Sequence, residues 1–312
     1  MRGIIGPVLI LLCTVIWGSA FVAQKLGADH FGPFAICCYR NLVAGVFLWG
    51  ALGLRRRFAR RVRDELGDSI LESPWKRAEV LGGAVSGAVL FVAMLAQQLG
   101  IEQTTPGVSA FLTANYVLIV PVLASFLGRR VRLPVWAGAA LAIVGTFLIC
   151  FSAEDLRRET INLGAGEKWT LVCAVLFAVQ IMVVDHFAPG NDMLRFSMVQ
   201  MFAAGMVALP FVFLPSELVR ASWQGLVKGI PALIYLGVFS SGIAYTLQNL
   251  GQARTRPALA AILMSMESVF GALFGWLLLG DILSARQVVG CLLVLAAVIL
   301  SQLLPDGKRR RD

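Results

Sequence analysis

Two stretches of the chain, QQLGIEQTTP at residues 97–106 and QNLGQARTRP at residues 248–257, share a Gln-x-Leu-Gly start and a closing proline. Gly100 and Gly251 are 151 residues apart, and Pro106 and Pro257 have the same separation. Each stretch follows one long apolar run and precedes another. Because proline lacks an N–H and fits the first turn of a helix, each stretch marks a turn between two helices. The constant spacing predicts an internal repeat.

Composition identifies the kind of protein in which this repeat lies. The chain has 312 residues, of which 58% are hydrophobic and 14% are charged. Soluble domains are roughly half apolar and about a quarter charged, so a soluble globular domain is excluded. The six cysteines lie in apolar runs without metal-site spacing, and the chain has two histidines, so we expect buried thiols and no metal site. A polytopic membrane protein remains.

Ten segments are long and apolar enough to cross a bilayer, which takes about 20 residues of helix. They run approximately from Ile4 to Leu26, Phe34 to Leu54, Glu79 to Gly100, Pro106 to Gly128, Pro134 to Ala153, Trp169 to Ala188, Arg195 to Leu214, Gly229 to Leu250, Pro257 to Gly280 and Ala285 to Leu304. The runs are continuous, unlike the alternating strands of a membrane barrel. They predict an all-α integral membrane protein with ten transmembrane helices.

The repeat divides these ten segments equally. In the earlier part of each half the separation is 160 residues, which pairs Trp17 with Phe177 and Gly45 with Gly205. The longer basic loop between the second and third segments accounts for the difference from 151. Five helices in each half is an odd number, so the second half enters the membrane from the opposite side. Two inverted five-helix repeats are typical of secondary transporters, which bind their substrate near the membrane midplane.

The distribution of positive charge predicts the orientation. Nineteen of the 27 Lys and Arg residues fall on one set of loops and ends, which includes the chain termini and the loop at 55–77. By the positive-inside rule, that set faces the cytoplasm. The loop at 55–77 has an alternative interpretation as a binding patch for anionic lipid. Because the cations lie between apolar runs, we expect a lipid bilayer and no nucleic acid as a partner.

Several motifs together resemble the EamA type of the drug/metabolite transporter superfamily. They are Trp17-Gly18-Ser19-Ala20-Phe21 with Lys25, Arg40, the two turns quoted above, and Leu277-Leu278-Leu279-Gly280-Asp281. The resemblance covers two copies of the domain, at residues 8–152 and 168–303, and leaves a basic tail at 304–312 that we expect in the cytoplasm. Within the superfamily the chain is similar to the YddG branch of aromatic amino acid exporters. Asp281 departs from the pattern, since the family more often has Glu there.

The resemblance implies a central cavity lined by the first, third, fourth, sixth, eighth and ninth helices. Polar residues at helical spacing on these segments, such as Thr113 with Tyr116 and Tyr245 with Gln248, share one face and turn away from lipid. The candidate substrate-binding residues are Trp17, Gln24, Met94, Gln97, Thr113, Tyr116, Gln180, Tyr245, Gln248 and Glu267. The alternative is that some of these side chains only join helices, at about 0.6 to 2 kcal/mol each.

Four charged residues in or beside the spans are candidates for coupling or gating. Glu267 lies near the midplane, where an unpaired charge costs several kcal/mol, and it is either a proton-coupling site or an acceptor for a substrate ammonium group. Its alternative is a protonated carboxyl bonded to a neighbouring helix. Arg40 can steer a substrate carboxylate, although a structural or snorkelling role is favoured because the second helix is not expected to line the cavity. Lys25 and Asp185, 160 residues apart, occupy equivalent places in the two halves.

These observations predict a secondary transporter that exports amino acids, aromatic or neutral and of broad range, or related small metabolites across a bacterial inner membrane. We expect alternating access, a small-molecule substrate and protons as the candidate coupling ion, with no cofactor and no ATP. Import by the same fold remains open. An intramembrane enzyme is disfavoured because HExxH, GxSxG and Walker motifs are absent. A non-transporting assembly protein remains a further alternative.

Overall fold

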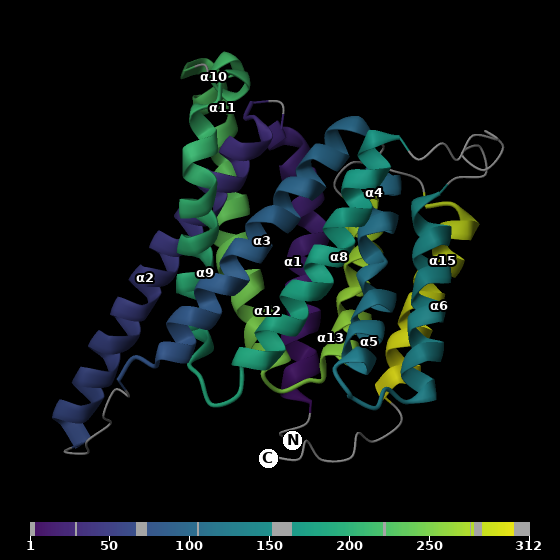
Figure 1. The fold of residues 1–312 in the computed structure, drawn as a ribbon, viewed down its shortest axis with the longest axis horizontal. Helices are drawn as coiled ribbons and strands as arrows, with labels where there is room; N and C mark the ends of the chain where they lie inside the picture. The colour runs from purple at the N-terminus through teal and green to yellow at the C-terminus, as the bar shows by residue number, and fades with distance from the viewer. Residues whose placement is uncertain are drawn as a thin grey trace.

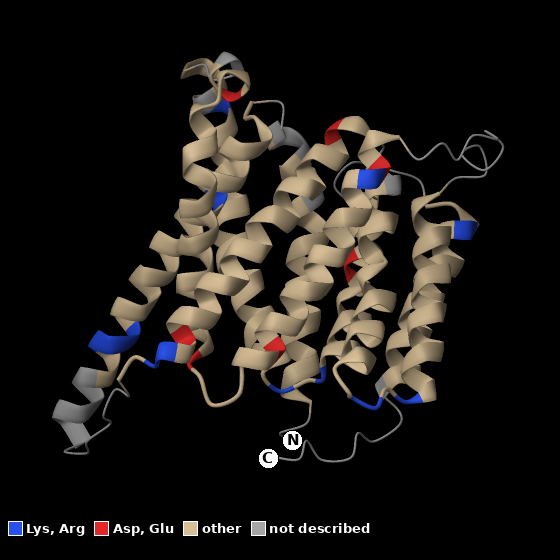
Figure 2. Cartoon of the chain, viewed as in Figure 1, with Lys and Arg blue, Asp and Glu red and all other residues tan. Residues whose placement is uncertain are grey.

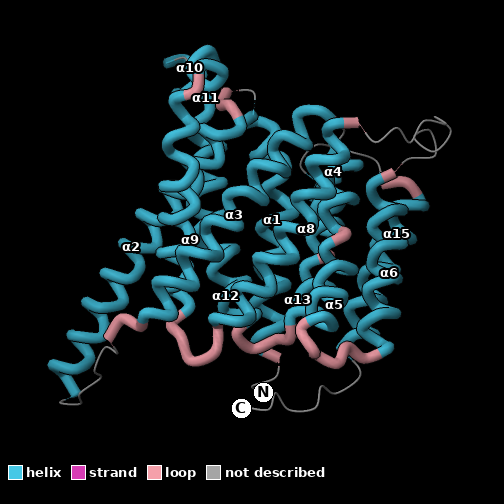
Figure 3. Tube along the Cα trace, viewed as in Figure 1, coloured by secondary structure: helices cyan, strands magenta, loops and turns pink. Residues whose placement is uncertain are grey.

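The computed structural model describes residues 4–28, 30–66, 74–104, 106–151, 164–220, 223–274, 276–277 and 283–302. Every regular element in these ranges is a helix (Figures 1 and 3). The tail at 304–312, Asp281 and the side chain of Lys25 lie outside the described part of the chain. The all-α prediction is confirmed for the residues described.

The first half of the chain contains six helical elements. They are α1 (Ile5–Ala28), α2 (Pro33–Leu66), α3 (Arg77–Gln103), α4 (Pro106–Ala114), α5 (Tyr116–Phe126) and α6 (Leu133–Cys150). The second half contains α8 (Ala165–Phe187), α9 (Met193–Ala208), the 3-10 helix η1 (Leu209–Phe213), α10 (Pro215–Arg220), α11 (Trp223–Ile234), the π-helix η2 (Tyr235–Ala244), α12 (Tyr245–Gln252), α13 (Pro257–Met264), α14 (Met266–Phe274) and α15 (Ala285–Gln302). Pro106 and Pro257 open their helices, as predicted.

Eight helical segments in the described residues are long and apolar enough to cross a membrane. They are Pro33–Ala59, Arg77–Gln103, Ser109–Phe126, Leu133–Cys150, Ala165–Phe187, Met193–Phe213, Trp223–Gln252 and Pro257–Phe274. Two shorter apolar stretches, Ile5–Ala20 and Ala285–Ser301, coincide with the first and last predicted segments. The chain is therefore a multi-pass membrane protein, and the count of ten spans stays a prediction.

Two of the spans are interrupted at matching places. The first interruption separates α4 from α5 at Asn115, and the second separates α13 from α14 at Ser265. Pro121 lies inside α5, beyond the first interruption, and the second half has an alanine at the repeat position, so proline does not explain either break. Side chains bond the local carbonyls instead: Asn115 Nδ2 donates to Phe111 and Leu112 at 3.1 Å each, and Ser265 Oγ donates to Ile262 at 2.6 Å.

The helices run in opposite directions in the two halves where their ends can be placed. Gly6, at the start of α1, approaches Arg254 and Thr255, and Asp185, near the end of α8, pairs with Arg129. The start of α1 and the end of α8 therefore lie at the same end of the molecule. We call this the basic end; its described Lys and Arg residues include Arg55, Arg129, Arg130, Arg132, Arg254 and Arg256, along the lower edge of Figure 2. The opposite end holds Glu167, Lys168, Glu217, Lys228 and Arg286.

Apolar packing in the described residues forms two large buried clusters that meet at the centre and a smaller third one around Val184 and Phe196. Trp17 of α1 and Phe177 of α8 each pack against both large clusters. Around them α3 lies against α8 and α9, α2 lies against α9, and α6 lies against α15. Close approach of α3 and α9 depends on glycine: a Cβ on Gly87 would lie 2.8 Å from the Cβ of Ala203 and also collide with the carbonyl of Gln200. The small residues Gly83 and Gly87 thus allow α3 and α9 to pack closely.

A matched pair of substitutions tests this contact. Alanine favours a helix over glycine by about 1 kcal/mol, so Gly50→Ala in α2, where an added Cβ has nothing within 4 Å, should keep or raise the unfolding midpoint in detergent. Gly87→Ala should lower the midpoint by several degrees, because α3 and α9 must separate. Equal shifts for the two variants would contradict the close-packing account.

Candidate functional site

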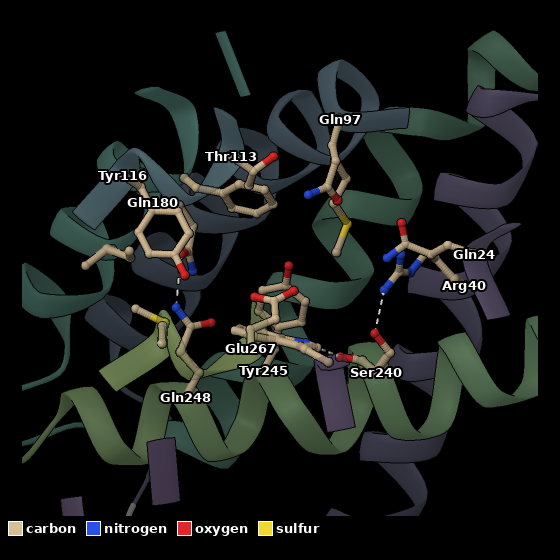
Figure 4. Close-up of a pocket in the computed structure, with 15 residues that line it drawn as sticks. Gln24, Arg40, Gln97, Thr113, Tyr116, Gln180, Ser240, Tyr245, Gln248 and Glu267 are labelled. Atoms are coloured by element: carbon tan, nitrogen blue, oxygen red, sulfur yellow. Dashed lines mark hydrogen bonds between the residues drawn. The ribbon is translucent and has the colours of Figure 1, made fainter. Parts of the chain in front are cut away.

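A cavity lies in the interior of the helix bundle, where the interrupted spans face α1, α8 and the π-helix. Its volume is about 50 Å³, enough for a few water molecules. The residues that line it are Trp17, Gln24, Arg40, Met94, Gln97, Thr113, Tyr116, Phe177, Gln180, Ile181, Ser240, Tyr245, Gln248, Met264 and Glu267 (Figure 4). All ten residues singled out as substrate-binding candidates from the sequence are among them.

The interruptions explain how two of these residues reach the cavity. Tyr116 directly follows Asn115, and Glu267 follows Ser265 by two residues, so each side chain starts from the first turn of a new helix. Such broken helices are tolerated inside a membrane only where the freed backbone groups find partners or line a cavity. The hydrogen bonds of Asn115 and Ser265 provide those partners. The break is thus a local feature that points Tyr116 and Glu267 inward.

Arg40 corrects one expectation from the sequence. We expected the second helix to stay away from the cavity and favoured a structural role for Arg40, but its side chain lines the cavity. Its guanidinium is held by two hydroxyl groups of the π-helix: Nε donates to Ser241 Oγ and Nη2 donates to Ser240 Oγ, each at 2.9 Å. The residue is 5% exposed. No local sequence pattern indicates this contact, because the Ser240-Ser241 pair has no recognisable spacing to a residue 200 positions earlier.

The π-helix also positions the aromatic wall of the cavity. Trp17 Nε1 donates to the carbonyl of Ser240 at 3.1 Å, and the rings of Trp17 and Tyr245 meet edge to face with centroids 4.8 Å apart. π-Helical turns are rare and frequently occur at functional sites, because they shift the side chains that follow. Here the wide turn brings Ser240, Ser241 and Tyr245 to the same region as Arg40.

Three glutamines form a polar wall on another side of the cavity. Gln248 Nε2 donates to Gln180 Oε1 at 3.3 Å and to Gln252 Oε1 at 3.1 Å. All three side chains are buried, and Gln180 Nε2 and Gln248 Oε1 have no partner among the described residues. In the view of Figure 4, Gln180 and Gln248 lie with Tyr116 on the side away from Arg40. This wall therefore offers one free donor and one free acceptor.

Glu267 lies on the cavity wall without a protein partner. Its side chain is half-buried, and no hydrogen bond or ion pair joins its carboxyl to another described residue. The alternative interpretation of Glu267, a carboxyl that is hydrogen-bonded to a neighbouring helix, is therefore not observed among these residues. In Figure 4 Glu267 lies beside Tyr245, between the glutamine wall and Arg40. An ionised carboxyl inside a membrane costs several kcal/mol, so an acidic residue at this position indicates a functional role.

Ion pairs join helices and loops at the basic end. Asp185, which is buried, pairs with the half-exposed Arg129 from the segment after α5. Farther along the same end, Arg55 pairs with Asp192 at 2.6 Å and Arg195 pairs with Glu79 at 3.6 Å. Of the two predicted equivalent residues, Asp185 thus lies in an interhelical contact, while the side chain of Lys25 is outside the described part of the chain. A second cavity, of about 480 Å³, opens beside the Arg129–Asp185 pair.

The charge state of Asp192 follows from its surroundings. Burial alone would raise the pKa of this carboxyl, but the hydrogen bond and charge of Arg55 and the N–H groups of Leu194 and Arg195 outweigh burial and lower the pKa. The resulting stabilisation is present at neutral pH and is lost as the pH falls through the lowered pKa. The Arg55–Asp192 pair is therefore formed at neutral pH.

Comparison with known proteins gives consistent results. The profile of the EamA-like transporter family matches residues 4–151 and again residues 164–303. An uncharacterized transporter of Archaeoglobus fulgidus is 26% identical over 295 residues, covering 94% of this chain and 84% of its own length. A probable terminal-alkyne amino-acid exporter of Streptantibioticus cattleyicolor is 26% identical over 311 residues, covering 96% and 94%. A solved structure titled "Crystal structure of protein" matches with a TM-score of 0.73 at 20% identity over 98% of both chains, which supports the fold alone.

The ion pair between Arg129 and Asp185 leads to a stability prediction. Arg129→Gln should lower the free energy of unfolding by about 1–3 kcal/mol, because it removes a charged partner from the buried carboxylate of Asp185. Arg130→Gln is the matched control, since exposed side chains away from such contacts contribute within about 0.5 kcal/mol. Unfolding midpoints in detergent measure both effects, and an Arg129→Gln variant as stable as the control would rule out the structural pair.

Proposed function

Because the chain belongs to the EamA-like transporter family, we propose that it is a secondary transporter that exports neutral amino acids, aromatic ones included, across the bacterial inner membrane by alternating access. The observation that carries the proposal is the cavity: ten residues selected as substrate-binding candidates from the sequence lie around one small space deep in the membrane-spanning bundle. Aromatic rings, a thioether and neutral hydrogen-bonding groups suit amphipathic solutes of varied shape. The exporter from Streptantibioticus cattleyicolor, named for an amino acid, supports the same substrate class.

The arrangement of two inverted five-helix repeats is part of this proposal. Two copies of the family profile match, and α1 and α8, the first helices of the copies, run in opposite directions. The cavity lining has matching residues at the repeat separations: Trp17 with Phe177, Met94 with Tyr245, Gln97 with Gln248, Thr113 with Met264, and Tyr116 with Glu267. These pairs support a pseudo-two-fold axis through the cavity, as in other inverted-repeat transporters.

Alternating access accounts for the size of the cavity. Sites for small molecules are about 300–1,000 Å³, and this cavity of about 50 Å³ is too small to admit an amino acid. The walls must therefore separate during transport. We propose that the ends open in turn, and that the Arg129–Asp185 pair, which joins the first half to the second at the basic end, is one of the contacts that break. Asp185 thus keeps its proposed gating role.

Orientation and coupling complete the proposal. The basic end faces the cytoplasm by the positive-inside rule, which places both termini inside, and export is from that end to the other. Protons are the proposed coupling ion and Glu267 their site, with no ATP required. The titratable groups around Glu267 are Cys13 of α1, Tyr116 of α5, Cys173 of α8 and Tyr245 of α12. Thiols and phenols ordinarily stay protonated below about pH 8, so a response near neutral pH belongs to the carboxyl.

Counterflow into proteoliposomes tests the transport proposal. With purified protein, vesicles preloaded with unlabelled amino acid should accumulate the radiolabelled form saturably for aromatic and other neutral amino acids. Empty vesicles and vesicles with a Gly87→Leu variant, whose helices cannot pack, provide the background. The absence of counterflow for every amino acid in the panel would overturn the amino acid assignment.

A single substitution tests the coupling. In wild-type vesicles, an acidic exterior should accelerate export against a gradient, because protons exchange for substrate at Glu267. Glu267→Gln should continue downhill exchange at high amino acid concentration and lose the response to the imposed pH gradient. Glu102→Gln, an exposed carboxyl near the end of α3, is the control and should behave as wild type. An unchanged pH response in Glu267→Gln would remove Glu267 from the coupling step.

A further inference from the structure

The cavity is lined by two charged side chains of opposite sign, the buried Arg40 and the half-buried Glu267, that form no ion pair with each other. Arg40 and Glu267 are the only Lys, Arg, Asp or Glu residues that line it in the described structure, and no ion pair joins them. Arg40 is 5% exposed, and its hydrogen-bond partners are the uncharged hydroxyl groups of Ser240 and Ser241. Burying an ionised group without a counter-charge costs several kcal/mol. Both groups are therefore available to pair with the charged groups of a bound ligand.

The free atoms of Arg40 match a carboxylate. A guanidinium has five N–H donors and stays protonated, and the two serine bonds occupy one donor on Nε and one on Nη2. The remaining donors, including both on Nη1, have no partner among the described residues and belong to a side chain that faces the cavity. The serine bonds fix the plane of the guanidinium, which prepares it for a bidentate contact with a carboxylate.

Glu267 offers the complementary group. Its carboxyl has no partner among the described residues, and Tyr245 lies within electrostatic range of both Glu267 and Arg40. Tyr245 therefore lies near both charged groups, and Figure 4 draws Glu267 beside it. An ammonium group can donate to the carboxylate there while its neighbouring carbon contacts the aromatic rings of Trp17 and Tyr245, which meet edge to face.

The two charged residues also differ in chemistry from the residues at the equivalent repeat positions. At the repeat separation of 160 residues Arg40 corresponds to Gln200, which is buried outside the cavity in bonds to Ser86 and Asn249. At the separation of 151 residues Glu267 corresponds to Tyr116. The other four pairs of lining residues are uncharged, so the halves build a largely neutral cavity and each half adds one charge. A ligand with both charges fits one orientation only.

We infer that the cavity recognises the zwitterion of an α-amino acid, with Arg40 binding the carboxylate and Glu267 the ammonium group, while the side chain extends to the uncharged wall at Tyr116, Gln180 and Gln248. The inference rests on the proposed function and deepens it, since it defines the substrate class by two required groups. It also explains proton exchange, because a proton and the ammonium group compete for the same carboxylate.

The test pairs substitutions in the protein with deletions in the ligand. The probes are L-phenylalanine, L-leucine and L-methionine, each with the amine that lacks the carboxylate and the acid that lacks the ammonium group. Affinity for purified protein is measured by calorimetry at neutral pH. For wild type, at least one amino acid should bind tenfold or more tightly than both its amine and its acid. If none of the three does so, the inference is overturned.

The variants identify which residue recognises which group. Arg40→Gln should reduce affinity for the amino acid at least tenfold and leave the amine unchanged, whereas Glu267→Gln should reduce affinity for the amino acid and leave the acid unchanged. Arg40→Lys, which keeps the charge, should recover part of the loss. Equal losses for amine and acid in either variant would show a general structural role and overturn the assignment.

The unfolding midpoint of the ligand-free protein provides an independent test. Because Glu267 has no counter-charge or hydrogen-bond partner among the described residues, Glu267→Gln should keep or raise the unfolding midpoint, whereas removing half of a structural ion pair would lower it. A lowered midpoint for Glu267→Gln would contradict the inference. The proposed function fails separately: zwitterion binding without counterflow would refute transport, and amino acid counterflow without tighter binding of the zwitterion than of its amine and acid would refute only the inference.

Discussion

The interior of a membrane offers no hydrogen-bond partners, and this constraint shapes every polar feature of the protein. Each polar group inside the bundle must be paired within the chain or must face a space that water or substrate can enter. Asn249 meets the constraint at its amide nitrogen, with bonds to Ser197 at 2.9 Å and Gln200 at 2.7 Å, which tie α12 to α9. Four side chains with free polar atoms, Arg40, Gln180, Gln248 and Glu267, line the central cavity instead. Incompletely paired groups of both charges and of neutral amides thus gather at one site.

Irregular helices deliver these groups to one place. The breaks at Asn115 and Ser265 and the π-helix Tyr235–Ala244 all occur at the depth of the cavity, and nearby side chains bond the carbonyl groups that a continuous helix would pair internally. Regular helices would have turned Tyr116, Glu267 and Ser240 to other faces. Close packing of glycines, as between α3 and α9, surrounds this irregular centre with a rigid frame. A transporter needs both parts, because the frame halves must move while the site between them stays assembled.

The lining residues that match between the two halves and the two charged residues that do not match have different roles in the cavity. Eight lining residues form four uncharged pairs at the repeat separations, and they supply shape, aromatic surface and neutral hydrogen bonds. Arg40 and Glu267 break the pairing and supply charge. The same asymmetry appears at the basic end, where Asp185 pairs with Arg129 and the residue equivalent to Asp185 is a lysine. A duplicated fold with the same charges in both halves would present a site without polarity; single charges in each half give the cavity a direction.

The amino-acid sequence by itself determined the helical class, the repeat and ten of the lining residues, because helical spacing and a constant separation act locally or between copies of one pattern. Tyr245 and Gln248 share a face for that reason, and their mates Met94 and Gln97 follow. Only the tertiary structure decided that Arg40 reaches the cavity, that Ser240 and Ser241 hold it, and that Glu267 has no protein partner in the described residues. Those facts depend on contacts between residues about 200 positions apart and on a π-helix that no local pattern indicates, because packing of one helix against another sets them.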